Sequence, residues 1–232
     1  MPEFHVTELR IGQPRPFGPR GEPSAIDRQP VAGALFAGRT GFDGDAVGDP
    51  ARHGGPDKAI HAYPVAHLAA WARDLPDLAA RFRPGAFGEN IVVEGATEAD
   101  FCLGDRWLLG GALLEVSQSR QPCWKLNIRF GLPDMARRVQ VTGRTGWYFR
   151  VIEPGIIAAG DKARLAHRPQ ARWPLTRVAQ LLYGAQLDRA SLEEFADLRD
   201  LPARWRDLAL ARLASGRVED WRTRLDTPGP IS

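Results

Sequence analysis

The 232-residue chain is long enough for one large domain, or for one domain with a small appendage, and its hydrophobic content of 44% is sufficient for a packed core. The formal net charge of +3 and the pI near 9.2 come from arginines spread along the chain, which weakly favours small anionic ligands and does not indicate a nucleic acid polymer as partner. Two cysteines are too few for a disulfide framework, no signal peptide is visible and no apolar run approaches the ~18 residues of a membrane span, so we expect a cytoplasmic protein without membrane attachment.

The N-terminal segment is predicted to form strands and turns. Apolar residues alternate with other residues at Phe4 and Val6 and again at Leu9 and Ile11. Between these two pairs the alternation is displaced by one residue. This pattern is typical of a strand that contains a β-bulge. The stretch 14–23 is rich in proline and glycine and is predicted to be a loop.

The stretch HGGPDKAIHAY, which begins at His53, combines paired glycines with basic side chains. Gly54 and Gly55 would let the backbone approach a ligand closely. His53, Lys58 and His61 supply donors suited to a phosphate or to the edge of a pterin. A tight turn with solvated histidines is the alternative. A zinc site is disfavoured, because the stretch has no HExxH pattern and no third ligand nearby.

The middle of the chain is predicted to contain two short helices and then a β-hairpin. Apolar residues after Pro64 keep a spacing of three or four that is interrupted at Pro76, so each helix has a proline at its first turn. Strands at 103–109 and 112–118 flank a Gly-Gly pair, which is a strong hairpin signal. Cys102, among apolar neighbours, is predicted to be a small buried side chain without a chemical role.

The stretch VSQSRQPCWKL carries one cysteine between two cations, where the β-pattern gives way to a turn. Arg120 and Lys125 favour the thiolate of Cys123, which is the form that attacks electrophiles or binds a soft metal. Pro122 restricts the backbone before the cysteine. A buried, inert cysteine at the end of a strand is the alternative. Further on, the stretch GRTGWYFRVI joins a glycine turn to a strand with alternating aromatic residues.

After the β-rich region the hydrophobic period changes to 3.6, which predicts three helices. Ser191 and Glu194 have the spacing of a capping box, and a further helix is predicted to begin at Pro202 and to end before Gly216. Acidic residues in the middle of this segment disfavour a DNA-binding role. We expect the segment 217–232, which is rich in proline and glycine at its end, to fray.

Four motifs in order, HGGPDKAIHAY, FGEN at 87–90, SQSRQPCWKL and TGRTGWYFRVI, resemble the MOSC domain of YiiM-like proteins. The resemblance covers roughly residues 5–165, and the helical end resembles the three-helix segment of the same proteins. It implies a mainly β fold with α-helices: a MOSC-type β-barrel with short helices at 1–168, followed by a small C-terminal three-helix segment with a frayed tail at 169–232.

The resemblance also implies a cofactor and a site. It implies that the molybdenum cofactor, a molybdopterin, binds with the Cys123 thiolate as a ligand to molybdenum, and that Arg120 and Lys125 act beside it as catalytic residues. The cofactor-binding residues that it implies are His53, Gly54, Gly55, Lys58, His61, Tyr63, Glu89, Asn90, Arg144, Trp147 and Arg150. For Arg144 and Arg150 in this list, the alternative is an arginine side chain that is solvated and binds no ligand.

The activity implied is that of an oxidoreductase that reduces N-hydroxylated small molecules, such as bases resembling 6-hydroxylaminopurine. Electrons would come from a separate reductase, a flavoprotein, because the chain has neither a ferredoxin-type cysteine cluster nor a flavin-type Rossmann fingerprint. Two alternatives stay open. One is a cofactor carrier or sulfur-transfer module with a persulfide on Cys123, and the other is a non-enzymatic interaction protein in which Cys123 is structural.

Overall fold

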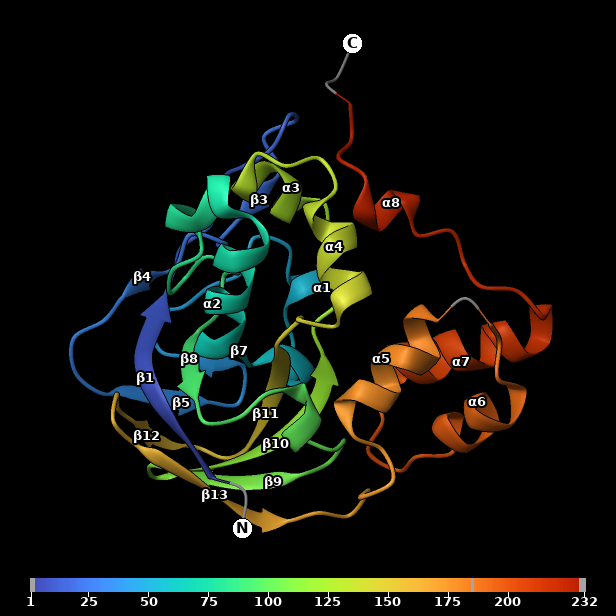
Figure 1. Ribbon diagram of the computed structural model, residues 1–232. Helices are drawn as coiled ribbons and strands as arrows, with labels where there is room; N and C mark the ends of the chain where they lie inside the picture. The colour runs from blue at the N-terminus through green and yellow to red at the C-terminus, as the bar shows by residue number, and fades with distance from the viewer. Residues whose placement is uncertain (1–2, 185, 230–232) are drawn as a thin grey trace.

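A closed β-barrel organises the residues that the computed structural model describes, which are 3–184 and 186–229 (Figure 1). Within these ranges an eight-stranded sheet has the order β13-β9-β10-β11-β7-β8-β1-β4, and pairing of β1 with β13 closes seven of the strands into a ring outside which β4 lies. Closure leaves the ring without free edges. The strands of the ring are β1 (Glu3–Ile11), β7 (Ile60–Pro64), β8 (Ile91–Glu94), β9 (Arg106–Leu109), β10 (Ala112–Ser119), β11 (Trp147–Glu153) and β13 (Lys162–His167).

Three features of the strands confirm the predictions from sequence. The register of β1 against β8 shifts between Val6 and Glu8, as a β-bulge requires. β9 and β10 form the predicted hairpin, which turns at Gly110 with a positive φ of 55°. The alternation in β11 buries Trp147 inside the barrel and turns the next residue, Tyr148, to the opposite face. Local patterns therefore predicted the pleat of these strands correctly.

Aromatic side chains fill the barrel interior. Phe101 lies with its ring centroid 4.1 Å from that of Trp147, and Phe4 lies 5.1 Å from Trp107. All four side chains are at most 2% exposed. Such pairs contribute roughly 0.5–1.5 kcal/mol each beyond the burial of their area. The interior is thus a packed core, and ligands are left to the ends of the strands and the loops that connect them.

Short helices and loops cover one side of the barrel. As predicted, two short helices follow Pro64, namely α2 (Val65–Asp74) and the 3-10 helix η2 (Pro76–Arg81). α3 (Lys125–Phe130) and α4 (Met135–Thr142) follow β10 and contribute with α2 to a second hydrophobic cluster. The remaining short elements before the C-terminal segment are β2 (Arg15–Pro16), β3 (Pro23–Ser24), β4 (Gln29–Pro30), β5 (Leu35–Gly38), β6 (Gly41–Phe42), α1 (Pro50–His53), η1 (Pro56–Lys58), η3 (Glu98–Asp100) and β12 (Gly155–Ile157).

The C-terminal segment contains the predicted helices α5 (Leu175–Tyr183), α6 (Arg189–Ala196) and α7 (Ala203–Ser215). α7 begins after Pro202 and ends at Ser215, before Gly216, as predicted. The predicted capping box of Ser191 and Glu194 is wrong. The side chain of Asp188 caps α6 by accepting a hydrogen bond from the Ser191 N–H at 3.1 Å, so the helix begins before Ser191.

The tail after α7 returns to the barrel, where α8 (Arg222–Leu225) lies near α3 and α4 (Figure 1). Leu225 is 1% exposed and belongs to the same hydrophobic cluster as Leu126. Asn127 Nδ2 donates to the Leu225 carbonyl at 2.8 Å. The prediction of a frayed tail is therefore wrong for 217–229, because apolar burial and hydrogen bonds hold this segment. Residues 230–232 lie outside the described residues.

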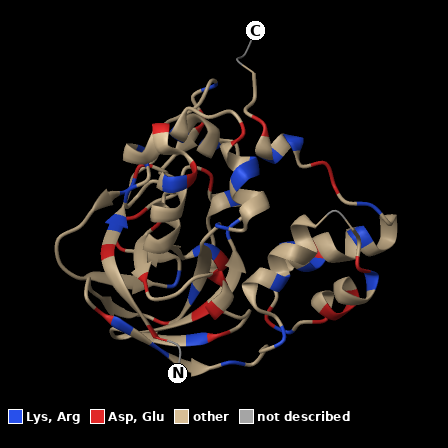
Figure 2. Ribbon diagram, viewed as in Figure 1, with Lys and Arg blue, Asp and Glu red and all other residues tan. Residues whose placement is uncertain are grey.

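Charged residues of both signs are distributed over the barrel and the three-helix segment (Figure 2). The expectation that the chain does not bind a nucleic acid polymer stays a prediction. Among the described residues, none of the helices has both the length and the apolar character required to cross a lipid bilayer.

The barrel core predicts a large effect of truncating Trp147, which is fully buried against Phe101. We expect Trp147→Ala to lower the free energy of unfolding by roughly 3–5 kcal/mol, because it leaves a cavity that the closed ring cannot collapse to fill. Val141→Ala, at a position that is 80% exposed, is the control and should change it by less than about 0.5 kcal/mol. Urea titration of the wild type and the two variants measures both changes. Similar midpoints for the wild type and Trp147→Ala would contradict the assignment of Trp147 to the core.

Candidate functional site

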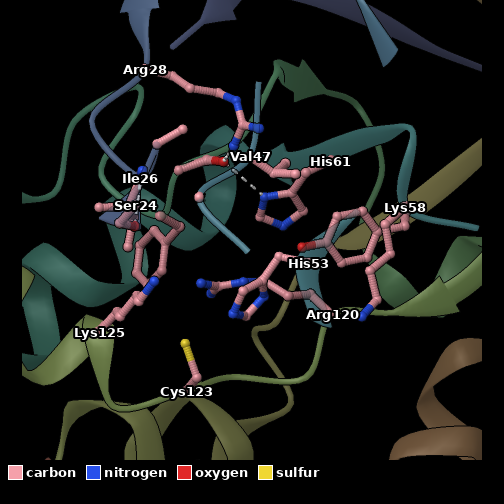
Figure 3. Close-up of a pocket in the computed structure, with 15 residues that line it drawn as sticks. Ser24, Ile26, Arg28, Val47, His53, Lys58, His61, Arg120, Cys123 and Lys125 are labelled. Carbon is pink, nitrogen blue, oxygen red and sulfur yellow. Dashed lines mark hydrogen bonds between the residues drawn. The ribbon is translucent and has the colours of Figure 1, made fainter. Parts of the chain in front are cut away.

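Two adjoining cavities meet at Cys123, and Figure 3 shows the residues that line the smaller of the two. The inner one has a volume of about 70 Å³, and the outer one, of about 570 Å³, extends to the C-terminal segment. The thiol of Cys123 points towards the side chains of Arg120 and His53 (Figure 3). The residues that border both cavities are Gly48, His53, Lys58, Cys123, Lys125 and Tyr148. A group bound at the thiol would thus be in reach of a second molecule in the outer cavity.

The loop that carries Cys123 connects β10 to α3. At its start, the Arg120 N–H donates to the Gly146 carbonyl at 3.0 Å, and after it the Leu126 N–H donates to the Cys123 carbonyl at 3.0 Å. Gly146 has a φ of 69°, and a Cβ there would lie 2.3 Å from the Ala62 carbonyl oxygen. Glycine is therefore required for the turn before β11 to come this close to β7.

Two lysines at the cavities are held by main-chain carbonyls. Lys58 Nζ donates to the Arg52 carbonyl at 2.5 Å, and Lys125 Nζ donates to the Pro23 carbonyl at 2.7 Å. In the described part of the chain, neither ammonium forms an ion pair with a carboxylate. A carbonyl satisfies a hydrogen bond but does not neutralise a charge. Both lysines therefore leave positive charge beside Cys123.

Arg120 is the cation whose bonding is incomplete. Its residue is 7% exposed, and its buried Nη1 has no hydrogen-bond partner among the described residues. The buried Nε2 of His61 likewise lacks one. An unsatisfied buried polar group costs about 1–3 kcal/mol, and more when it is charged. Such groups are rare in folded proteins and identify the inner cavity as a place where a polar or anionic ligand would be stabilised.

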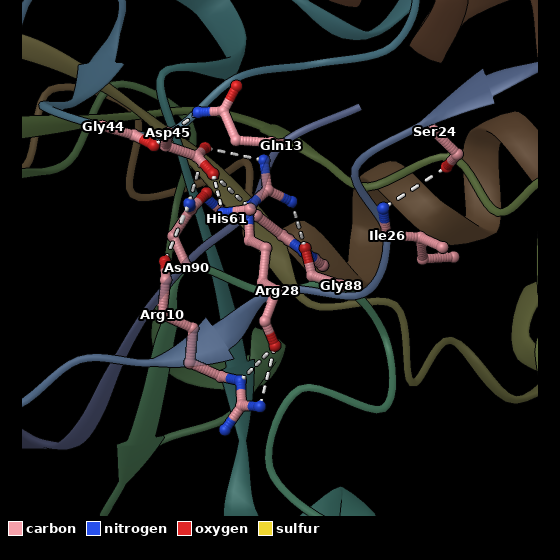
Figure 4. Close-up of polar contacts among 11 residues, drawn as sticks. Arg10, Gln13, Ser24, Ile26, Arg28, Gly44, Asp45, His61, Gly88 and Asn90 are labelled. Atoms are coloured by element: carbon pink, nitrogen blue, oxygen red, sulfur yellow. Dashed lines mark hydrogen bonds and ion pairs between the residues drawn. The ribbon is translucent and has the colours of Figure 1, made fainter. Parts of the chain in front are cut away.

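A polar network holds His61 in place (Figure 4). The His61 N–H donates to Asn90 Oδ1 at 3.1 Å, and Asn90 Nδ2 donates to Asp45 Oδ2 at 2.9 Å. Asp45 also accepts from Arg28 Nε at 2.9 Å, and Arg28 Nη1 donates to the Gly88 carbonyl at 2.5 Å. The same carbonyl lies 3.4 Å from His61 Nδ1. A carbonyl can only accept, so this contact places the imidazole proton on Nδ1.

Both histidines at the inner cavity are neutral at pH 7. Burial, together with the positive charges of Lys125, Lys58 and Arg120, lowers the pKa of His53 from 6.5 to about 4. Burial, followed by the charge of Arg120, also holds the pKa of His61 well below its usual value. Burial lowers the pKa of Lys58 too. These shifts share one physical cause, which is desolvation in a region of excess positive charge.

The structure brings some of the predicted site residues together and separates others from them. Those that border one or both cavities are Cys123, Arg120, Lys125, His53, Lys58 and His61. In the described part of the chain, those that border neither are Gly54, Gly55, Tyr63, Glu89, Asn90, Arg144, Trp147 and Arg150. The two glycines form the turn between α1 and η1, and Asn90 acts on the cavity through His61.

Tyr63 and Glu89 support the wall of the inner cavity from behind. The fully buried carboxylate of Glu89 accepts from the N–H groups of Gly85 at 2.6 Å and Phe87 at 3.0 Å. Burial raises the pKa of Glu89. The ring of Tyr63 stacks on Phe87 with 4.1 Å between centroids. Both residues therefore fix the turn that presents Phe87 and Gly88 to the cavity, and neither reaches it.

Three further residues of the predicted site lie away from the two cavities. Trp147 belongs to the barrel core and is 0% exposed. Arg150 binds Asp57 at 2.5 Å and Glu115 at 2.7 Å, so its charge is neutralised and is not offered to a ligand. Arg144 pairs with a carboxylate at the end of α2 at 2.5 Å. Arg150 is not a solvated arginine, because the two carboxylates bind its guanidinium.

Several cavity residues were not predicted from the sequence. Tyr148 follows from the strand alternation, since it faces away from the core that contains Trp147. Arg28, Arg204 and Arg224 have no local signal, because each reaches the cavities from a segment distant in sequence. Arg204, which lies on α7, brings a side chain of the C-terminal helices to the outer cavity.

Comparisons with known proteins match both parts of the chain. The MOSC domain matches residues 49–164, and the YiiM-like 3-alpha helix domain matches 173–216. Protein YiiM of Escherichia coli (strain K12) is 36% identical over 207 residues, which are 89% of this chain and 92% of that protein. A protein of Gibberella moniliformis named Reductase is 35% identical over 214 residues, which are 90% of this chain but 37% of that longer protein. The crystal structure of YiiM from Escherichia coli is 32% identical and superposes with a TM-score of 0.78, covering 92% of this chain and 98% of that one.

The depressed pKa of His53 predicts an acid-sensitive stability. Because this pKa is about 4 in the folded protein and 6.5 ordinarily, the unfolded chain binds more protons between these values. The free energy of unfolding should therefore fall as the pH decreases from 6.5 towards 4. We expect His53→Gln to remove part of this fall, and His167→Gln, at an exposed position, to leave it unchanged. Denaturant titrations at pH 7 and pH 4.5 measure the difference, and equal falls in both variants would contradict the prediction.

Proposed function

Because this chain belongs to the YiiM-like family of MOSC domain proteins, we propose that it is an oxidoreductase that binds the molybdenum cofactor at Cys123 and reduces N-hydroxylated compounds. Bases resembling 6-hydroxylaminopurine are the proposed substrate class. The relative named Reductase supports the reaction type. The observation that carries the proposal is an excess of buried positive charge around an accessible thiol.

The residues present fit this cofactor. Molybdopterin combines a phosphate and a dithiolene with a polar heterocyclic edge, so it is anionic and needs hydrogen-bond partners. Arg120 Nη1 is a buried donor without a partner, and Lys58 and Lys125 keep their charges because carbonyls hold them. The thiolate of Cys123 is a soft ligand suited to molybdenum. The cavities thus offer the charge, the donor and the sulfur that such a group requires.

The neutral histidines have a different task from the cations. His53 and His61 can exchange hydrogen bonds with a bound heterocycle without adding charge, because their low pKa values keep both imidazoles unprotonated. With its proton on Nδ1, His61 offers Nε2 as an acceptor. We therefore propose that the two histidines orient the heterocycle and that the cations bind the anionic groups of the cofactor.

When bound, the cofactor's metal would supply the two-electron reduction R–NHOH + 2e⁻ + 2H⁺ → R–NH₂ + H₂O. Residues that border both cavities are placed to supply a proton to the leaving oxygen. Tyr148 is one of these residues, and burial raises the pKa of its phenol, which keeps a proton on Oη at pH 7. The outer cavity, of about 570 Å³, is large enough for a substrate the size of a purine base.

Electrons are proposed to come from a separate flavoprotein reductase. The relative named Reductase extends well beyond the part that this chain matches. The sequence of this chain has neither a ferredoxin-type cysteine cluster nor a flavin-type Rossmann fingerprint, so the proposed reaction needs an external electron donor. The proposed partner is therefore a second protein that delivers electrons to the cofactor.

Cys123→Ser tests the proposal, with Cys102→Ser as the matched control because Cys102 is 4% exposed and borders neither cavity. Purified from a host that makes the cofactor, the wild type and the control should carry close to one molybdenum per chain. Cys123→Ser should lose the metal and reduce the amine-forming rate with a chemical electron donor by at least ~100-fold. Elemental analysis and product chromatography measure these quantities.

Folded wild-type protein without molybdenum or pterin would contradict the proposal. A persulfide on Cys123 in that protein would favour a sulfur-transfer module instead, and unchanged properties of Cys123→Ser would favour an interaction protein.

Arg120→Met provides an independent test of the fit. Removing a buried, partly unpaired cation relieves a cost in the apoprotein but deprives the cofactor of a donor. We expect the variant's apoprotein to have an equal or higher free energy of unfolding and its pterin content to fall by at least ~10-fold. Urea titration and fluorescence of oxidised pterin measure the two effects. Undiminished pterin content would show that Arg120 does not hold the cofactor.

A further inference from the structure

Arg224, in the tail after the three-helix segment, binds the main chain on both sides of Cys123. Its guanidinium Nη1 donates to the Pro122 carbonyl at 2.6 Å. Its own carbonyl accepts from the Trp124 N–H at 2.8 Å. Its second terminal nitrogen, Nη2, donates to Gln140 Oε1 on α4 at 2.6 Å. One residue of the tail thus connects the cysteine loop to a helix of the barrel domain.

These contacts act on the conformation of Cys123 itself. The Pro122 carbonyl belongs to the peptide unit before the Cys123 Cα, and the Trp124 N–H belongs to the peptide unit after it. Fixing both planes fixes the φ and ψ of Cys123, because those are the two soft backbone dihedrals at that Cα. The direction of the Cα–Cβ bond, and hence the place of the thiol, follows from them.

The tail is held firmly enough to fix the backbone conformation of Cys123. Leu225, next to Arg224, is buried, and Asn127 donates to its carbonyl at 2.8 Å and to Thr227 Oγ1 at 3.3 Å. At the other end, Glu219 accepts from Arg212 at 2.8 Å. Arg212 lies on α7 and is only 2% exposed. The position of the tail is therefore set by the barrel domain and the three-helix segment together.

We propose that Arg224 is a positioning residue, which holds the thiol of Cys123 at the junction of the two cavities. The inference rests on the proposed role of Cys123 as a ligand and extends it to a residue outside the MOSC and three-helix matches. It gives the three-helix segment a role as well, since that segment leads the tail back to the cysteine loop (Figure 1).

The positive charge of Arg224 is a separate property from its geometry. Arg224 borders the outer cavity, where a charge alone would favour a thiolate. Lysine would keep the charge, but a single ammonium cannot reproduce the planar fork that reaches the Pro122 carbonyl and Gln140 together. Arg224→Lys therefore separates positioning from electrostatics.

The experiment uses the full-length apoprotein, so that its result does not depend on metal. The rate of alkylation of Cys123 by iodoacetamide is measured by mass spectrometry between pH 6 and 10, and amide exchange of the peptide 120–127 is followed in parallel. The variants are Arg224→Lys and Arg224→Ala. Arg222→Ala is the control, because this arginine is on the same helix, is exposed and pairs with Asp220.

We expect both Arg224 variants to change the alkylation rate at least ~3-fold and to speed exchange of the loop peptide ~10-fold, while the control matches the wild type. Wild-type alkylation and exchange in both Arg224 variants would overturn the proposal. Wild-type behaviour of Arg224→Lys combined with an altered Arg224→Ala would also overturn it, in favour of a purely electrostatic effect.

If Arg224→Ala does not fold, Gln140→Met replaces it, since it removes one anchor of the guanidinium and keeps Arg224. We then expect an intermediate acceleration of amide exchange. Exchange at the wild-type rate in Gln140→Met would contradict the positioning role. Molybdenum content is measured separately. Altered alkylation together with a wild type that lacks molybdenum would sustain the positioning role and reject the proposed function.

Discussion

Positive charge that is bound but not neutralised is the constraint on which the site depends. Lys58 and Lys125 are held by carbonyl oxygens, and Arg120 keeps one donor unpaired. Each arrangement satisfies local geometry while leaving net charge beside Cys123. Burial is the first cause of the neutral state of His53 and of the lowered pKa of Lys58, and the second cause is the surrounding field of positive charge. An anionic ligand would relieve it, which is why a cofactor with a phosphate and a dithiolene suits the cavities.

The barrel makes this concentration of charge tolerable. Its core of packed aromatic residues and its closure between β1 and β13 give a rigid frame, so that segments next to β7, β10 and β11 meet at one place. Carboxylates form ion pairs with two arginines of the barrel domain and neutralise their charges. Asp45 pairs with Arg28, and Asp57 and Glu115 pair with Arg150. Arg28 borders the inner cavity with its charge paired, whereas Lys58, Lys125 and Arg120 have no carboxylate partner among the described residues.

The motifs that indicate the family do not by themselves say which of their residues reach a ligand. In GRTGWYFR, strand alternation buries Trp147 in the core and turns Tyr148 to the cavities, so neighbouring letters have different roles. In FGEN, Glu89 and Asn90 bind neighbouring main chain and side chains, while Phe87 and Gly88 form the cavity wall. A motif preserves a folded unit, and only part of that unit faces the site.

Local sequence was sufficient to predict the bulged first strand, the hairpin, the three helices and the cysteine between cations, because these depend on periodicity, turn residues and neighbours a few positions apart. Tertiary structure alone decided that Arg28 and Arg204 border the cavities, that Arg150 is neutralised and that the tail returns to bind beside Cys123. Those outcomes depend on hydrogen bonds and ion pairs between residues that can be more than a hundred positions apart, such as Arg224 and Pro122 or Arg204 and Ala51. No local pattern encodes such a contact, since loop closure brings the partners together only when the whole barrel has formed.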